Sequence, residues 1–388
     1  MKTQIKIDFF IIFLLVFTPF MIPVYFLEYL DLGRLFNLWK VASLLYTIIQ
    51  LIIINKFVIS KEVIILVIFS LFLFLSTLLY SFENLYEWSK YILSFIIPSI
   101  IFYFYLKNYS VQLLGSLEII LGAEIFINVI TQIIFPNGLY LTGGRGTTIA
   151  FVLGMENRFF FTYITFLAFG IPLINCYKRF KVFYYVTLIV INISLFYAWS
   201  VGAMIAIVIF DILLILNYFK IFPLNIKKAT IILLFLNLGI VFFQIQQYFA
   251  SFIENVLKKS VTFSGRTALW NMAIDYIKQR FLFGYGMNSS EDLMKMYVGL
   301  VHPHNQLLQV LFQSGVLGFS IHILFIGSCL YKLSKLNDKK LYNFMIIVYF
   351  SLFIALIADS WTSTPYFYMI FFLFTMPVIN NTNNNEAR

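Results

Sequence analysis

The chain has 388 residues, of which 61% are hydrophobic, 20% aromatic and 11% charged, and its net charge is +10. Soluble proteins are close to half apolar and about a quarter charged, so this composition excludes an ordinary soluble domain as well as a disordered or collagen-like chain. It predicts an integral membrane protein.

Long apolar stretches divide the chain into predicted membrane spans. A helix needs about 20 apolar residues to cross the hydrocarbon core, and lipid offers no hydrogen-bond partner to an unpaired backbone group. We therefore expect an all-α integral membrane protein with about twelve transmembrane helices in one polytopic domain, residues 1–388. The predicted spans are Asp8 to Leu27, Leu38 to Phe57, Val63 to Tyr80, Tyr91 to Leu106, Val111 to Phe135, Phe159 to Tyr177, Val182 to Ala198, Met204 to Phe219, Ala229 to Gln247, Asn305 to Leu330, Leu341 to Asp359 and Thr362 to Ile379.

The distribution of lysine and arginine predicts the orientation of these spans. One set of alternate connections holds most of the basic residues, whereas the other set is nearly balanced by acids. Basic residues are retained on the cytoplasmic side, so both termini are expected there. The basic balance is thus a topology signal, and no nucleic-acid partner is expected.

Two predicted outer connections are longer than the rest. The third outer loop runs from Pro136 to Arg158, and the fifth, between spans nine and ten, runs from Tyr248 to His304. Within the fifth loop, an amphipathic helix is expected from Arg266 to Arg280 and a short helix from Ser289 to Tyr297. Long loops in compact proteins are often functional, so we expect the chemistry there.

Two of the three histidines lie together at the outer mouth of the tenth span. Histidine exchanges a proton near neutral pH more readily than other side chains. Pro303 suits the first position of a helix, which would place His304 in the first turn, where the helix dipole favours a neutral ring. His304 is therefore a candidate general base or, alternatively, an interfacial capping residue. His302 is the weaker candidate, and His322, inside a span, is expected to be a packing residue.

A polar stripe continues from these histidines into the tenth span. Gln306, Gln309 and Gln313 recur at helical spacing, and lipid would penalise them unless they face the bundle interior or a wet cavity. They could bind substrate or simply hold helices together. Gly315 and Gly318 would let another helix approach closely.

Arginines on the outer side are candidates for binding phosphate, because the guanidinium group is always charged and its planar fork of donors fits phosphate oxygens. The group comprises Arg145, Arg158, Arg266 and Arg280. A structural ion pair or a contact with a lipid headgroup is the alternative for each of them except Arg266, which stands in a recognisable motif.

That motif is Ser264, Gly265, Arg266, Thr267, Ala268, Leu269 and Trp270, followed by Phe283, Gly284, Tyr285 and Gly286, and then by His304, Asn305, nine residues, Gly315, two residues and Gly318. It resembles the O-antigen ligase and polymerase superfamily. The resemblance implies a GT-C-like membrane fold with a large extracytoplasmic loop late in the chain. It also implies an enzyme of the bacterial plasma membrane that joins glycans carried on polyprenyl diphosphate at the outer face.

The resemblance also implies roles for residues. His304 matches the family's essential histidine, thought to deprotonate the acceptor hydroxyl, and Arg266 matches an arginine that binds the diphosphate. Substrate-binding roles are expected for Arg145, Arg158, Asn305, Arg280, His302 and Gln309. Ligases usually carry Ser-Arg-Gly between the seventh and eighth spans, but this chain has Ser200, Val201 and Gly202. Either Arg145 or Arg158 replaces the missing arginine, or the donor is held differently.

This departure favours a polymerase that joins lipid-linked oligosaccharide repeat units into O-antigen or capsular polysaccharide. The alternatives are a ligase that transfers the glycan to a lipid core and, from another class, a transporter or flippase, for which Glu118, Glu124 and Asp211 inside spans would speak. The chain has no Asp-x-Asp pair, and Glu291 and Asp292 point to different helix faces, so no metal and no other cofactor is expected. The expected partners are the polyprenyl-diphosphate-linked oligosaccharide and membrane lipid, with a chain-length regulator protein as a further candidate.

Overall fold

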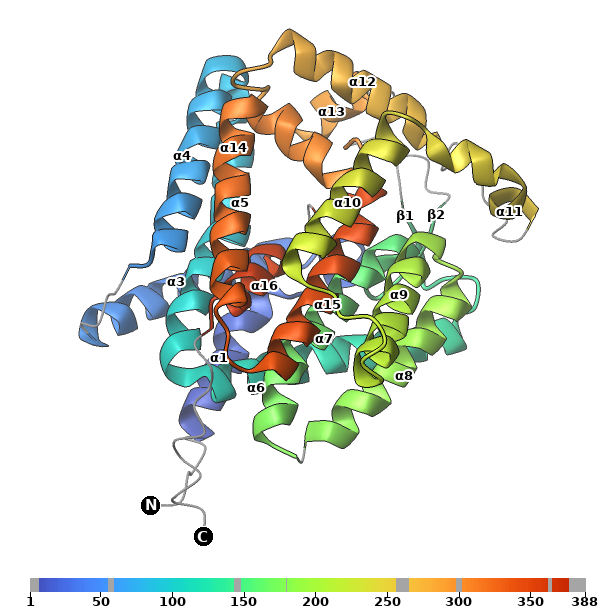
Figure 1. The fold of residues 1–388 in the computed structure, drawn as a ribbon. Helices are drawn as coiled ribbons and strands as arrows, with labels where there is room; N and C mark the ends of the chain where they lie inside the picture. The colour runs from blue at the N-terminus through green and yellow to red at the C-terminus, as the bar shows by residue number, and fades with distance from the viewer. Residues whose placement is uncertain are drawn as a thin grey trace.

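The computed structural model describes residues 7–54, 59–142, 148–178, 180–255, 265–297, 302–361 and 365–376, and these are mainly helical (Figure 1). The helices before the first strand are α1 (Ile7–Phe17), α2 (Val24–Glu28), α3 (Gly33–Ile54), α4 (Lys61–Tyr80), α5 (Leu85–Tyr91) and α6 (Ile97–Ile134). Three short strands follow: β1 (Tyr140–Thr142), β2 (Thr148–Phe151) and β3 (Gly154–Met155). The remaining helices are α7 (Phe159–Cys176), α8 (Phe180–Ala198), α9 (Val201–Tyr218), α10 (Ile226–Val241), α11 (Ala250–Asn255), α12 (Arg266–Gln279), α13 (Ser290–Met296), α14 (Gln306–Ser334), α15 (Lys339–Ile357) and α16 (Tyr366–Phe374).

Seven helical stretches among the described residues are long and apolar enough to cross a membrane, as expected for an α-helical membrane protein. They are Lys61–Tyr80, Phe82–Ile134, Glu156–Asn175, Phe180–Ala198, Val201–Tyr218, Gln306–Ser334 and Lys339–Ile357. The stretch Phe82–Ile134 has 53 residues and contains the predicted fourth span and all but the last residue of the fifth. Its backbone leaves the helical conformation at Tyr109. At about 1.5 Å per residue it measures roughly 80 Å, enough for two crossings of a core about 30 Å thick. The number twelve stays a prediction.

The first predicted span is not one helix. α1 ends at Phe17, a 3-10 turn occupies Thr18–Phe20, and α2 begins only at Val24. Pro19 and Pro23 cause the break, because proline lacks the amide proton that a helix interior needs and its ring collides with the preceding turn.

The segment predicted as the third outer loop contains a small antiparallel sheet, which its sequence did not indicate. Its strands lie in the order β1-β2-β3, with Tyr140 opposite Ala150 and Phe151 opposite Gly154. Gly154 has a φ of +95°, which a residue with a side chain rarely adopts. The chain then passes directly into α7, so the sheet positions the residues that precede this helix.

The described part of the segment predicted as the fifth outer loop lies across one end of the helix bundle (Figure 1). The predicted amphipathic and short helices are present as α12 and α13, within two residues of the expected bounds. The buried side of α12 is formed by Leu269, Trp270, Ala273 and Ile277. These side chains share a second hydrophobic core with Val241 of α10 and Phe312 of α14, so the loop is packed onto the bundle.

A backbone interlock joins this loop to α14. The helical conformation is interrupted at Gly315, where φ is +59° and ψ is −172°. Residues 281–286 form backbone hydrogen bonds with the residues on either side of this interruption. There Tyr285 N donates to Phe312 O at 2.8 Å, and Val316 N donates to Phe281 O at 2.8 Å. A Cβ added at Gly284 would lie 2.5 Å from the backbone nitrogen of Gly315, so this close approach requires glycine.

The same loop segment is bonded to α4, which packs along α14. The Ser76 hydroxyl donates to the Phe283 carbonyl, and the Ser81 hydroxyl donates to the Tyr285 carbonyl at 2.6 Å. Gly318 faces Phe72 of α4, as expected for a glycine that admits another helix. Gly315, by contrast, admits the loop backbone, so the expectation of helix contact was wrong there.

Candidate functional site

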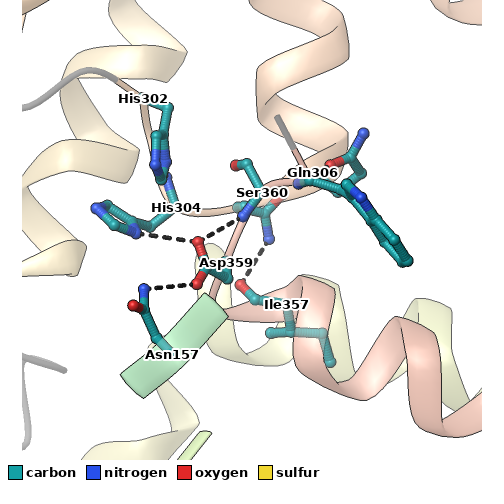
Figure 2. A network of polar contacts seen from close by, with 9 residues as sticks. Asn157, His302, His304, Gln306, Ile357, Asp359 and Ser360 are labelled. Atoms are coloured by element: carbon teal, nitrogen blue, oxygen red, sulfur yellow. Dashed lines mark hydrogen bonds and ion pairs between the residues drawn. The ribbon is translucent and has the colours of Figure 1, made fainter. Parts of the chain in front are cut away.

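The candidate site lies where the start of α14 meets the end of α15 (Figure 2). Asn305 is the N-cap of α14: its Oδ1 accepts from Leu308 N at 3.0 Å, and its Nδ2 donates to Ile357 O at 2.9 Å. Gln306 Oε1 accepts from Trp361 N at 2.7 Å. These bonds fasten the two helix ends together and bring His304 beside Asp359.

The Asp359 carboxylate is buried and accepts three hydrogen bonds. Asn157 Nδ2 donates to Oδ2 at 2.9 Å, Ser360 N donates to Oδ1 at 2.8 Å, and His304 Nδ1 lies 3.3 Å from Oδ1. Burial raises the pKa of Asp359, but the hydrogen bond from His304 and the positive charge of Arg266 outweigh it. The pKa of Asp359 is therefore below its ordinary value, and the group is a carboxylate near neutral pH.

His304 stands just before α14, not in its first turn. The helix begins at Gln306, and His304 has a φ of +51°, so the prediction that Pro303 begins the helix was wrong. Asn305 takes the capping position instead, because its side-chain oxygen satisfies an otherwise unpaired amide of the first turn. A positive φ is uncommon for a residue with a side chain, and such strained positions cluster at active sites.

The contact with Asp359 fixes what the imidazole of His304 can do. A proton on Nδ1 is held towards the carboxylate, which leaves the lone pair on Nε2. The His304 side chain is 17% exposed, so a ligand can reach part of it. A base oriented by a buried carboxylate is the arrangement used by many enzymes to deprotonate a hydroxyl.

His302 contacts both the backbone and the ring of His304. Its Nδ1 accepts from His304 N at 3.3 Å, and the two rings are 4.0 Å apart. Burial lowers the pKa of His302 to about 3, and nearby positive groups act in the same direction. His302 is therefore neutral near pH 7 and adds no positive charge next to His304.

Two arginines lie close enough to this group for their charges to act on it. Arg266 begins α12, burial lowers its pKa, and the charge of Asp359 opposes that change. Arg158 precedes α7, its charge lowers the pKa of His302, and its Nη1 donates to Glu28 Oε1 at 3.4 Å. The structure thus brings Arg266, His302 and His304 together around Asp359, and it places Arg158 near His302.

Other predicted residues are placed differently. Arg145 and Ser264 fall outside the described residues. Arg280 follows α12, whose 14 residues span about 20 Å, so it is far from Arg266. Its guanidinium is stacked between the rings of Tyr80 and Tyr285, at 4.4 and 4.3 Å. Its predicted role in substrate binding has no support from this position.

The polar residues of α14 divide into two kinds. Asn305 is fully buried, and both ends of its amide are used inside the protein, so it has a structural role here, and its contact with substrate stays a prediction. Gln309 is 4% exposed, and its Oε1 has no partner among the described residues. That buried acceptor is available to a ligand or a water.

Sequence reasoning missed Asp359 and Asn157. Asp359 served only as the end of the eleventh predicted span, although ionisable residues within a span are rare and often functional. Asn157 stood beside Arg158 in the third outer loop without a distinguishing pattern. Two of the acidic residues inside predicted spans also have polar surroundings. The Asp211 side chain forms a hydrogen bond with Asn192, and Glu124 lines a small cavity together with Arg158.

The ligand atoms of His302, His304 and Asp359 all lie within 4.8 Å of one another, close enough to hold a metal ion. No other such group occurs in the part of the chain that the structure describes. Arg158 and Arg266 add positive charge around it, which disfavours a divalent cation and favours an anion.

Comparison with known families decides the identity of the chain. A family model described as O-antigen ligase matches residues 130–323, which is half of the sequence. The chain belongs to the O-antigen ligase family. A comparison with curated proteins found no match.

Members of the O-antigen ligase family are membrane glycosyltransferase-like enzymes that act on polyprenyl-linked glycans, and they include both ligases and related polymerases. The matched segment contains Arg158, Arg266 and His304 but ends before Asp359. In this family member, the carboxylate that contacts His304 therefore comes from outside the matched segment.

Proposed function

We propose that the protein is a polymerase that transfers a growing glycan from polyprenyl diphosphate to a sugar hydroxyl of a lipid-linked repeat unit. The observation that carries this proposal is the contact between His304 Nδ1 and Asp359, with Arg158 and Arg266 nearby. A hydroxyl-activating base beside an anion-binding pair of arginines suits a reaction whose leaving group is a diphosphate.

In the proposed reaction, the acceptor hydroxyl lies against Nε2 of His304. Its oxygen forms the new bond to the anomeric carbon as the bond from that carbon to the diphosphate oxygen breaks. The hydroxyl proton passes to Nε2, and Asp359 stabilises the imidazolium that forms, because its carboxylate faces Nδ1. Polyprenyl diphosphate leaves with its negative charge held by the arginines. No step needs a metal ion.

Arg158 supports the choice of polymerase. The outer turn where ligases usually carry an arginine has Ser200 and Val201, and both are buried at the start of α9. Arg158 from the third outer loop supplies a positive charge near His302 instead. In our proposal, Arg158 and Arg266 hold the donor diphosphate, with Gln309 as a further polar contact.

The proposed setting is the outer face of the bacterial inner membrane. There the chain has twelve spans, a large outer loop between the ninth and tenth, and cytoplasmic termini. The distribution of basic residues supports this orientation, and the packing of α12 on α10 and α14 is compatible with a loop that covers the outer end of the bundle.

Purified protein in lipid nanodiscs tests the proposal when lipid-linked repeat units are the only substrate. We expect a ladder of products that differ by one repeat, and no ladder from His304→Ala, because loss of a general base typically costs about 100- to 10,000-fold in rate. Folding of the variant is checked by its thermal transition. A normal ladder from His304→Ala would refute the assignment of the base.

The ligase is the second candidate, because the matched family model is described as O-antigen ligase. The same assay separates the two functions by the acceptor. A protein that forms no ladder from repeat units alone, but transfers glycan once lipid core is added, is a ligase, and the polymerase proposal then fails.

A further inference from the structure

Three tyrosines form an aromatic cluster beside Arg158. Tyr25 lies in α2, Tyr29 follows it, and Tyr140 lies in β1. The cluster is tied to the third outer loop, because Tyr25 N donates to the carbonyl of Val152 at 3.1 Å. The loop that positions Arg158 therefore positions these rings as well.

Tyr29 presents an exposed ring that its neighbours hold in place. The ring of Tyr25 is stacked on it at 5.2 Å with an interplanar angle of 18°, and Tyr140 lies 5.4 Å away at 44°. Tyr140 is 7% exposed, whereas Tyr29 is 57% exposed. A rigid aromatic surface of this kind loses little conformational freedom when a ligand covers it.

A carboxylate lies next to these rings. Glu28 Oε1 accepts from Arg158 Nη1 at 3.4 Å, and Oε2 accepts from the Thr142 hydroxyl at 3.2 Å. The Glu28 side chain is 45% exposed. Its negative charge would repel a diphosphate, so the phosphate groups are expected on the opposite side of Arg158, towards His302.

We infer that Tyr29 and Glu28, supported by Tyr25 and Tyr140, form a subsite for a sugar ring of the transferred oligosaccharide. The flat face of an aromatic ring packs against the C–H face of a pyranose, and a carboxylate accepts hydrogen bonds from sugar hydroxyls. Arg158 bonds Glu28, and its chain neighbour Asn157 donates to Asp359 Oδ2 at 2.9 Å, so the subsite adjoins the proposed reaction centre. This assignment rests on the proposed function, because it names what that site binds.

The alternative explanation is a lipid anchor, since tyrosines are common at membrane interfaces. A leucine at position 29 keeps an apolar side chain but removes the flat ring and the hydroxyl, whereas phenylalanine keeps the ring. Tyr248 is 88% exposed and follows α10, so Tyr248→Leu is a matched control outside the cluster.

The test measures binding of a lipid-free glycan to the full-length protein in nanodiscs. The probe is the oligosaccharide released by mild acid from the lipid-linked pool of the producing cells, and binding is followed by saturation-transfer NMR and titration. We expect Tyr29→Leu to raise the Kd about 3- to 10-fold, the loss expected for one aromatic contact. Glu28→Gln should also weaken binding, whereas Tyr29→Phe and Tyr248→Leu should bind as the wild type does.

Wild-type binding by Tyr29→Leu, or no saturable binding by the wild type, would overturn the subsite. If Tyr29→Leu shows no thermal transition, the variant is unfolded and Glu28→Gln serves as the test instead. Unchanged glycan binding by Glu28→Gln would then overturn the subsite. If the wild type binds the glycan but forms no ladder, the subsite stands and the proposed polymerase function fails. If the wild type forms a ladder but Tyr29→Leu binds the glycan unchanged, the polymerase function stands and the subsite fails.

Discussion

Replacement of Asp359 by asparagine tests what the carboxylate contributes to catalysis while His304, the proposed base, stays in place. The carboxylate lies 3.3 Å from His304 Nδ1 and is also bonded by Asn157 and Ser360, so Asp359→Asn keeps the shape of the site and removes its charge. A hydrogen bond to a charged group contributes about 1.5–3 kcal/mol. Because the imidazolium exists only as the reaction proceeds, that loss falls on kcat, by about 10- to 150-fold.

The assay is the nanodisc ladder reaction, with kcat and KM measured at several pH values. Asp338→Asn is the matched control, because Asp338 caps the other end of α15 and asparagine caps a helix equally well. A merely structural role for Asp359 would lower the thermal transition and the amount of active protein without changing the pH profile of kcat. Wild-type kcat in Asp359→Asn would refute the role of the carboxylate.

Three further predictions concern stability and metal dependence. The pKa of His302 in the folded protein is lowered from 6.5 to about 3. Between pH 3 and pH 6.5 the unfolded state therefore binds a proton on His302 that the folded state does not. The free energy of unfolding should fall as the pH drops below 6.5, by about 2 kcal/mol at pH 5. Thermal unfolding at pH 7 and pH 5 should show this slope in the wild type and not in His302→Asn; an equal slope in both would exclude His302 as its source. Gly284→Ala should destabilise the protein by about 1–3 kcal/mol, because φ is +70° at Gly284 and the added carbon meets backbone atoms. Gly327→Ala is the control, because the space around Gly327 is open and no destabilisation is expected. Equal thermal transitions of the two variants would contradict the backbone interlock. Chelator should leave turnover of the purified enzyme unchanged, and loss of turnover restored by magnesium would instead assign an ion to the cluster of His302, His304 and Asp359.

Local patterns predicted the elements of the fold better than their contacts. The apolar stretches and the amphipathic pattern of α12 follow from the preference of each residue for lipid, core or water, which sequence spacing reveals directly. The sheet of the third outer loop was missed because its strands have only two to four residues. The start of α14 was misplaced because Pro303 and Asn305 both suit a helix start, and only the bonds to Leu308 and Ile357 select Asn305.

The candidate site was predictable only in part for the same reason. His304 and Arg266 stand in a motif, but His304 and Asp359 are 55 positions apart in the sequence, and nothing along the chain pairs them. Gly315 looked like a helix-packing glycine because its neighbours are helical, although its positive φ serves the backbone of residues 281–286. Such partners become visible only when tertiary contacts are known.

The position of His304 is determined by bonds on both sides of it in the chain. The Asn305 cap fixes the following residue to α14 and α15, and His302 Nδ1 accepts from the backbone nitrogen of His304 itself. A φ of +51° costs roughly 1–3 kcal/mol and persists only where the surroundings enforce it. The strain is therefore offset by the same bonds that join α14 to α15. It follows that the end of α15, beyond the matched family segment, is needed to aim the imidazole as well as to supply its carboxylate.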